Sequence, residues 1–193
     1  MFALPFTHKK EKIVAVLDIG SGSAGYCLVE AGRNAPLKIL ASERLILPFE
    51  ERTGEQTKSA VLTLLNQACE KAVSVYAQTI AQKGAPPISS SYAILRAPFV
   101  RSEFASAQIE YETDQRITEE VIGGLAKQAL ASESKLNHQN LFEAGVVSVE
   151  LNGYATKKPL GKSAHTISVT TIISECEPDF RAKVTEILQR SFP

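Results

Sequence analysis

Near the N-terminus, a cluster of glycine and serine residues, GSGSAG at positions 20–25, separates two short apolar runs. By its letters the cluster matches the GxGxxG fingerprint of dinucleotide-binding folds. That fingerprint needs a helix that opens at its last glycine, because the pyrophosphate sits on the helix N-terminus. Here the β-branched and aromatic run from Tyr26 to Val29 continues as a strand instead. The chain must therefore turn tightly between two strands, and we expect a β-hairpin at this place.

Composition and charge exclude several classes of protein. The chain has 193 residues, of which 44% are hydrophobic and 22% are charged, which is typical of a globular protein rather than a disordered, collagen-like or coiled-coil chain. Its length fits one ordinary domain or two small ones. The 21 basic residues equal the 21 acidic ones, so the overall positive field of a general nucleic-acid binder is missing. We expect no nucleic-acid partner.

The sequence also lacks metal-site and secretion signals. Its cysteines and histidines lie far apart, at Cys27, Cys69, Cys176, His8, His138 and His165. No pair of them has the spacing of a zinc site or a CxxC motif, and an odd number of cysteines argues against a disulfide framework. The start of the chain places its apolar stretch before its basic residues, the reverse of a secretory signal, and no apolar run is long enough to span a membrane. We therefore expect a cytoplasmic protein.

Downstream of the hairpin, hydrophobic periodicity gives the order of the other elements. We expect a third strand at about 37–47 and a long helix whose apolar stripe covers 61–80 and which ends at Gly84. The later elements are strands at 91–95 and 102–112, a helix at 117–131 capped by Thr118, strands at 143–154 and 163–174, and a helix at 178–190. The predicted order is β-β-β-α-β followed by β-α-β-β-α, with a seam near 97–100.

The residues of the first hairpin suit an anion. Glycines let backbone amides approach a phosphate closely, so Gly20 and Gly22 favour a nest of donors, to which Ser21 and Ser23 add hydroxyl groups. Asp18, at the end of the first strand, is placed to hold a magnesium ion through water, because magnesium gives up its water reluctantly. The structural alternative is a plain glycine-rich hairpin with an Asp-capped turn. The motif alone leaves both interpretations open.

Two strings of residues resemble one superfamily of ATP-binding proteins. VAVLDIGSGSAGYCLVE, at 14–30, resembles the first phosphate-binding hairpin of the actin, Hsp70 and sugar-kinase superfamily, in which D-x-G precedes a turn of small residues. LNGYATKKPLGK, at 151–162, resembles a hairpin in the small subdomain that is inserted into FtsA-like cell-division proteins and PilM-like pilus-assembly proteins. The matching residues are Asn152-Gly153-Tyr154 and Pro159-Leu160-Gly161. The order of elements also matches, so the resemblance covers nearly the whole chain.

The resemblance implies an α/β fold with an α+β insertion. Residues 1–97 would form the N-terminal part of an actin-like, ribonuclease H-like ATPase subdomain, 98–176 an inserted β-α-β-β subdomain of the SHS2 type, and 177–193 a helix that returns toward the first subdomain. Family members continue with a second half that carries a second phosphate loop and the adenosine pocket. No D-x-G follows Asp18 in this sequence. We therefore expect the N-terminal half of such a protein.

The implied cofactor is ATP with magnesium, bound by the intact protein. Asp18 would order the metal, and the phosphates would meet Gly20, Ser21, Gly22 and Ser23. No residue of this chain is expected to be catalytic, because water would be positioned by groups in the second half, and the intact protein would have at most weak ATPase activity. A phosphate held from one side only loses most of its burial, so we expect this chain alone to bind ATP poorly.

The implied partners are proteins. FtsA-like proteins tether a polymerising division protein of the FtsZ type to the inner face of the cytoplasmic membrane, and the inserted subdomain serves self-association. Membrane contact would be indirect or through a C-terminal segment that this chain lacks. Two alternatives stay open: a PilM-like adaptor for type IV pilus assembly, and a nucleotide-free interaction module if the native chain ends at Pro193.

Overall fold

The computed structural model describes residues 12–32, 36–131 and 136–192. The chain forms two compact units: unit 1 consists of Met1–Phe99 and Pro178–Pro193, and unit 2 of Val100–Glu177. The sequence predicted the inserted subdomain at residues 98–176, and unit 2 spans 100–177. The N-terminal stretch that was compared with a secretory signal lies outside the described residues.

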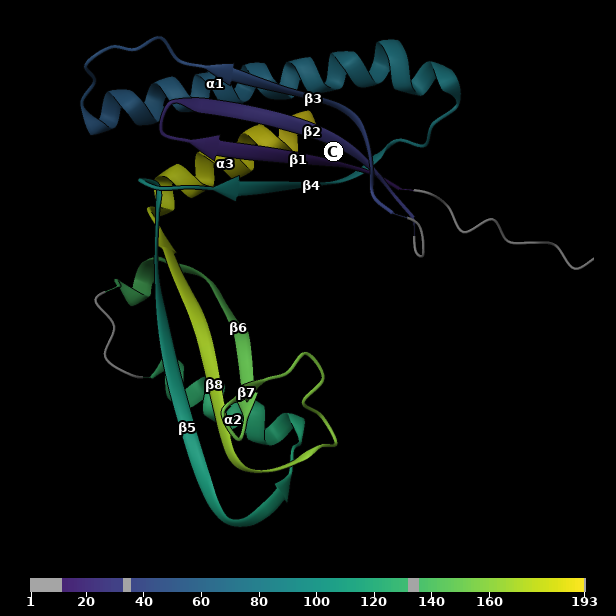
Figure 1. The fold of residues 1–193 in the computed structure, drawn as a ribbon. Helices are drawn as coiled ribbons and strands as arrows, with labels where there is room; N and C mark the ends of the chain where they lie inside the picture. Colours follow the sequence, from purple (N-terminus) through teal and green to yellow (C-terminus); the bar gives the residue numbers. More distant parts are fainter. Residues whose placement is uncertain (1–11, 33–35, 132–135, 193) are drawn as a thin grey trace, which may run out of the picture. The chain divides into compact units, whose positions relative to one another are not determined.

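Unit 1 is built on a four-stranded sheet with the order β3-β2-β1-β4 (Figure 1). Its strands are β1 (Lys12–Gly20), β2 (Ser23–Ala31), β3 (Lys38–Ile46) and β4 (Ile88–Leu95). The first three strands form an antiparallel meander, and β4 pairs with β1 in parallel. A parallel pair needs a long crossover, which a helix between β3 and β4 supplies. The turn of the first hairpin therefore lies at the carboxyl end of the parallel pair.

Two helices, α1 (Gly54–Val75) and α3 (Pro178–Ser191), lie on one face of this sheet (Figure 1). α1 begins at a capping box in which Thr53 and Gln56 bond each other's backbone amides. A π-helical turn, Tyr76–Ile80, and a 3-10 turn, Ala81–Lys83, follow it and end at Gly84, whose φ of 80° is left-handed. The predicted helix and its end are confirmed, and the capping box starts the helix ahead of its apolar stripe.

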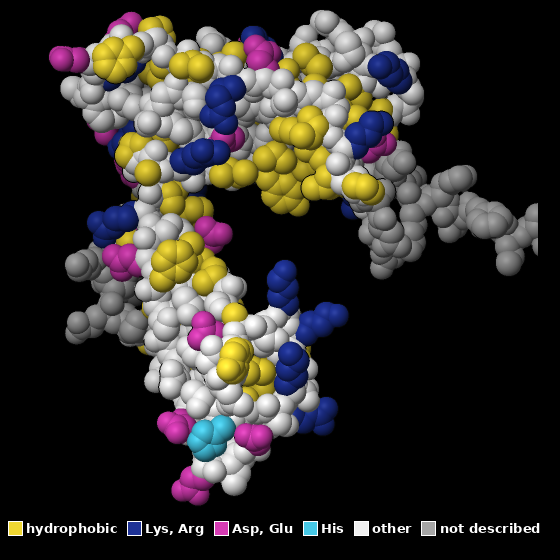
Figure 2. Space-filling view, viewed as in Figure 1, with side chains coloured by type: hydrophobic (Ala, Val, Ile, Leu, Met, Phe, Trp, Pro, Cys, Tyr) yellow, Lys and Arg dark blue, Asp and Glu magenta, His cyan; other side chains and the backbone are white. Residues whose placement is uncertain are grey.

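The core of unit 1 follows from the alternation of side chains along β1. Every second residue from Ile13 to Ile19 is buried, as is Leu65 on α1, so an apolar sheet face packs against an apolar helix stripe. The ring of Phe99 stacks on that of Phe180 in α3, with centroids 4.4 Å apart. The remaining residues of β1 belong to the opposite face, where Tyr92 of β4 stays exposed. Figure 2 shows hydrophobic side chains beside basic ones on this open face.

Unit 2 contains a second four-stranded sheet, with the order β5-β8-β6-β7 and antiparallel pairing throughout (Figure 1). Its elements are β5 (Val100–Arg116), α2 (Glu119–Leu130), a 3-10 turn (His138–Asn140), β6 (Leu141–Leu151), β7 (Tyr154–Ala155) and β8 (Ser163–Cys176). The hydroxyl of Thr118 caps α2 by accepting the amide of Val121 at 3.4 Å, as expected. α2 packs on β5 and β8. The first residue of β5, Val100, pairs with the last residue of β8, Cys176.

The coarse prediction of a mixed α/β fold is confirmed, because each unit combines a four-stranded sheet with helical packing. The predicted order of elements is found, with the two-residue strand β7 in addition. No helix in the described part of the chain is long and apolar enough to cross a membrane.

Candidate functional site

The turn of the first hairpin consists of Ser21 and Gly22, since Gly20 pairs directly with Ser23. None of the glycines in this cluster adopts a positive φ, so the backbone conformation does not require them. At Gly25 packing is tight, because a Cβ atom there would lie 3.2 Å from the carbonyl oxygen of Glu43 on the neighbouring strand. A Cβ atom at Gly22 would meet no atom within 4 Å. The space around the turn is therefore open.

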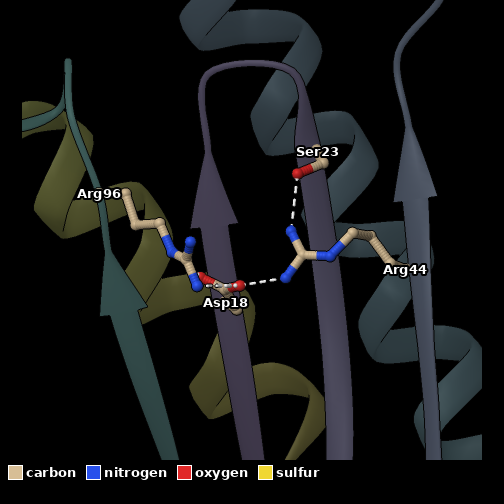
Figure 3. Close-up of polar contacts among 4 residues, drawn as sticks. All are labelled: Asp18, Ser23, Arg44 and Arg96. Atoms are coloured by element: carbon tan, nitrogen blue, oxygen red, sulfur yellow. Dashed lines mark hydrogen bonds and ion pairs between the residues drawn. The ribbon is translucent and has the colours of Figure 1, made fainter.

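Asp18 lies on the open face of the sheet, near the end of β1, and is the centre of a polar cluster (Figure 3). Arg96 donates from Nε to Oδ1 at 2.6 Å and from Nη2 to Oδ2 at 2.8 Å. Arg44 donates from Nη2 to Oδ2 of the same carboxylate and from Nη1 to Ser23 Oγ at 2.8 Å. We call these four residues the Asp18 cluster.

Strand register brings the Asp18 cluster together. Asp18 pairs with Gly25 on β2, and Gly25 pairs with Arg44 on β3, so the two charged side chains lie on the same face with only a glycine between them. Arg96 directly follows β4, and its amide donates to the carbonyl of Ile19 at 3.0 Å. The cluster thus lies at the carboxyl ends of the parallel strands, where open α/β sheets bind their ligands.

The cluster carries a net charge of +1, from two guanidinium groups and one carboxylate. The Asp18 side chain is only 16% exposed, whereas those of Arg44 and Arg96 are 46% and 62% exposed. The negative group is therefore covered and the positive groups face solvent. An approaching ligand meets the arginines first.

An open depression of about 430 Å³ adjoins the cluster and is lined by residues that include Val16, Asp18, Cys27, Ser42 and Arg44. Burial raises the pKa of the Cys27 thiol above its ordinary value. The thiolate is the reactive form of cysteine. Burial thus favours the less reactive thiol form of Cys27, which lines the depression.

Of the residues expected at the site, Asp18 and Ser23 join the cluster. Gly20 ends β1 beside it, and Ser21 and Gly22 form the turn. Sequence reasoning missed Arg44 and Arg96. They lie 26 and 78 residues from Asp18, on other strands of the sheet. The one signal in the sequence was a charged residue near the end of each of those strands, and a single charge of that kind has no specific meaning without the register.

The surroundings of Asp18 test the magnesium ion that the resemblance implies. Magnesium is bound through oxygen ligands, and its charge favours negative surroundings. Both oxygens of Asp18 already accept N–H groups from guanidinium groups, and both charged partners are positive. The residues in this arrangement do not fit a magnesium ion, and Asp18 as a metal ligand stays a prediction.

Comparisons with known proteins add little to this geometry. No family model matches the sequence, and no curated protein matches it. One similar solved structure comes from a structural study of the Aquifex aeolicus PPX-GPPA enzyme, with 15% sequence identity and a TM-score of 0.31. The match covers 44% of this chain and 26% of that one, so it spans about a quarter of that protein's length. A likeness of this size carries no argument about function.

Proposed function

We propose that the chain is the N-terminal part of an FtsA-like cell-division protein, an ATP-binding actin-like adaptor that links a division filament to the inner face of the cytoplasmic membrane. The observation that carries the proposal is the placement of the D-x-G hairpin. Its turn lies at the carboxyl end of the parallel pair β1 and β4, beside a cluster of positive charge. This is the edge of an open α/β sheet at which phosphate groups are bound.

Unit 2 supports an adaptor role in this proposal. It is inserted between β4 and α3 in the sequence, as the inserted subdomain is in FtsA-like proteins. Its sheet exposes large apolar side chains that a solitary domain has little reason to keep, among them Phe104 at 69% and Tyr154 at 79%. Such side chains suit contacts with further copies of the protein or with an FtsZ-like partner.

The chemistry proposed for unit 1 is binding and not catalysis. The turn Gly20–Ser23 and the two arginines meet a terminal phosphate of ATP, and the groups that would position water lie in the second half of an actin-like protein. ATPase activity of the intact protein is then weak at most. The PilM-like alternative shares all of these features and differs only in the partner.

A second candidate function, a nucleotide-free interaction module, is favoured by a different observation. The carboxylate of Asp18 is already neutralised by two arginines, and the open face of the unit 1 sheet exposes Ile46, Tyr92 and Ile94. A face of this kind suits a protein partner or a second copy of the chain. In that case the hairpin is structural.

Depletion of the protein from its native cells separates these functions. A block in division, with cells that elongate without septa, is the expected result. Loss of surface pili with normal division would move the protein to the pilus adaptors. Normal division and normal pili, together with no change in melting temperature on addition of ATP, would overturn the proposal in favour of the interaction module. The intact mass of the native polypeptide is measured in parallel, since the proposal expects about twice the 20.9 kDa of this chain.

A further inference from the structure

We propose that the Asp18 cluster binds a phosphate or diphosphate group without a divalent cation, with Arg44 and Arg96 as the ligands and Asp18 as the residue that positions them. The inference rests on the proposed function, because the same hairpin binds the phosphates. It differs in the groups that bind them. Under the implied mechanism Asp18 serves a metal ion. Here the two guanidinium groups take the place of the metal.

The donor count favours this assignment. A guanidinium group has five N–H donors in a planar fork that matches the oxygens of phosphate. Arg44 uses one donor on Ser23 and one on Asp18, and Arg96 uses two on Asp18, so each retains three. Both side chains are about half exposed, and their remaining donors are within reach of a ligand.

Asp18 gives the arginines a fixed geometry. A free arginine side chain loses rotamer entropy when a ligand immobilises it. In the cluster, hydrogen bonds to Asp18 and Ser23 already hold the arginine side chains in place. Binding of an anion therefore costs less conformational entropy. The carboxylate cancels only one of the two positive charges, and the remainder attracts the anion.

The glycines of the turn leave room for this ligand. Gly22 has neither a positive φ nor a neighbour that a Cβ atom would contact, so neither conformation nor packing explains the absence of a side chain there. The turn lies next to Ser23, whose hydroxyl already bonds Arg44. A phosphate at the arginines would approach the backbone of this turn closely.

Substitution of Asp18 distinguishes binding through a metal ion from binding through the arginines. Asp18→Asn raises the net charge of the cluster from +1 to +2. If Asp18 ordered magnesium, this change would abolish metal-dependent binding of ATP. If the arginines bind the phosphate, binding in EDTA survives the change, and Arg44→Gln or Arg96→Gln weakens it instead.

The test is equilibrium binding of pyrophosphate, ATP and adenosine to the 193-residue chain at low ionic strength, in EDTA and again in magnesium. We expect pyrophosphate and ATP to bind in EDTA, adenosine not to bind, and Arg44→Gln and Arg96→Gln each to weaken binding by about tenfold or more, as for loss of a charge-assisted hydrogen bond. The matched control is Arg101→Gln, which removes an ion pair with Glu175 in unit 2 and should leave the affinity unchanged. Circular dichroism verifies that every variant is folded.

Each other outcome has a distinct meaning. Binding that requires magnesium and is lost in EDTA overturns this inference and leaves the nucleotide function standing. Binding equal to that of sulfate at the same ionic strength, or unaffected by both arginine changes, shows a non-specific surface charge and also overturns it. Absence of binding under every condition overturns the inference, and the same titration on the full-length native polypeptide then decides the nucleotide function of the intact protein.

Discussion

Two glycine-bearing hairpin turns, one in each unit, connect their strands with different backbone conformations. In unit 2, Asn152 and Gly153 connect β6 to β7 with φ values of 52° and 82°. This is the left-handed conformation that favours Asn-Gly in two-residue hairpins. In unit 1, Ser21 and Gly22 connect β1 to β2, and neither residue has a positive φ.

The comparison shows that a different physical factor favours glycine at each position. Gly153 is fixed by backbone conformation, and Asn152 adds side-chain hydrogen bonds, since its Oδ1 accepts the amides of His165 and Thr166 at 2.9 Å each. Gly25 is fixed by the close approach of β3. Gly22 has neither reason, which leaves it available to a ligand. Substitutions at these positions separate the three cases.

The largest effect is expected at the unit 2 turn. Asn152→Ala removes an acceptor of two backbone amides and places alanine in a left-handed conformation, so we expect unit 2 to lose about 3 kcal/mol of stability. Hydrogen exchange of the β8 amides measures this loss within unit 2. Asn152→Gly, which keeps the conformation and loses only the side-chain bonds, should cost clearly less. Equal losses for the two variants would contradict the role given to the backbone.

Gly153→Ala tests the backbone requirement alone. An alanine at a φ of 82° is strained, and we expect a loss of about 1.5 kcal/mol in the exchange of the same amides. Gly145 on β6 provides the control, because a Cβ atom there would meet nothing within 4 Å and its φ is not left-handed. If Gly153→Ala lowers the stability no more than Gly145→Ala does, the left-handed φ is not the reason for glycine at position 153.

Gly25→Ala tests the packing requirement in unit 1. Its methyl group would press on the carbonyl of Glu43, which belongs to the β2–β3 ladder and cannot move without lengthening hydrogen bonds. We expect a loss of about 1 kcal/mol, of the size seen for mild overpacking, in the exchange of the β3 amides. Unchanged protection of those amides would show that β3 adapts freely.

Gly22→Ala should have the smallest effect on folding. Its methyl group meets no atom, so we expect a stability change within about 0.5 kcal/mol. Binding of pyrophosphate should nevertheless weaken, because the methyl group occupies the space above the turn. A loss of stability as large as that of Gly153→Ala would show that this glycine is structural after all.

Local sequence patterns predicted most of the fold. The apolar run that contains Asp18, the stripe of α1 and the cap at Thr118 each depend on neighbouring residues, and each was found where expected. The π-helical turn at Tyr76–Ile80 has no comparable signal, because it continues the same apolar stripe. Strand β7 is only two residues long, too short for a periodicity.

The candidate site was only partly predictable for the same reason. Asp18 and Ser23 lie in one hairpin, where the D-x-G pattern marks Asp18 and the glycine and serine cluster after it contains Ser23. Arg44 and Arg96 reach the carboxylate only through strand register and a parallel crossover, which no local pattern encodes. The two arginines also reverse the expected electrostatics. The sequence predicted a carboxylate open to a cation, whereas the structure shows the Asp18 carboxylate covered by two positive groups.

The pairing of Val100 with Cys176 has an evolutionary consequence. Partners in an antiparallel ladder have Cα atoms about 5 Å apart, so the chain enters and leaves unit 2 at a single place. In unit 1 the residues that flank it, Phe99 and Phe180, are also held together by their stacked rings. Unit 2 is thus a cassette: one recombination event can add, remove or exchange it without rethreading a strand of either sheet, and a lineage can acquire new partners while its first hairpin stays unchanged.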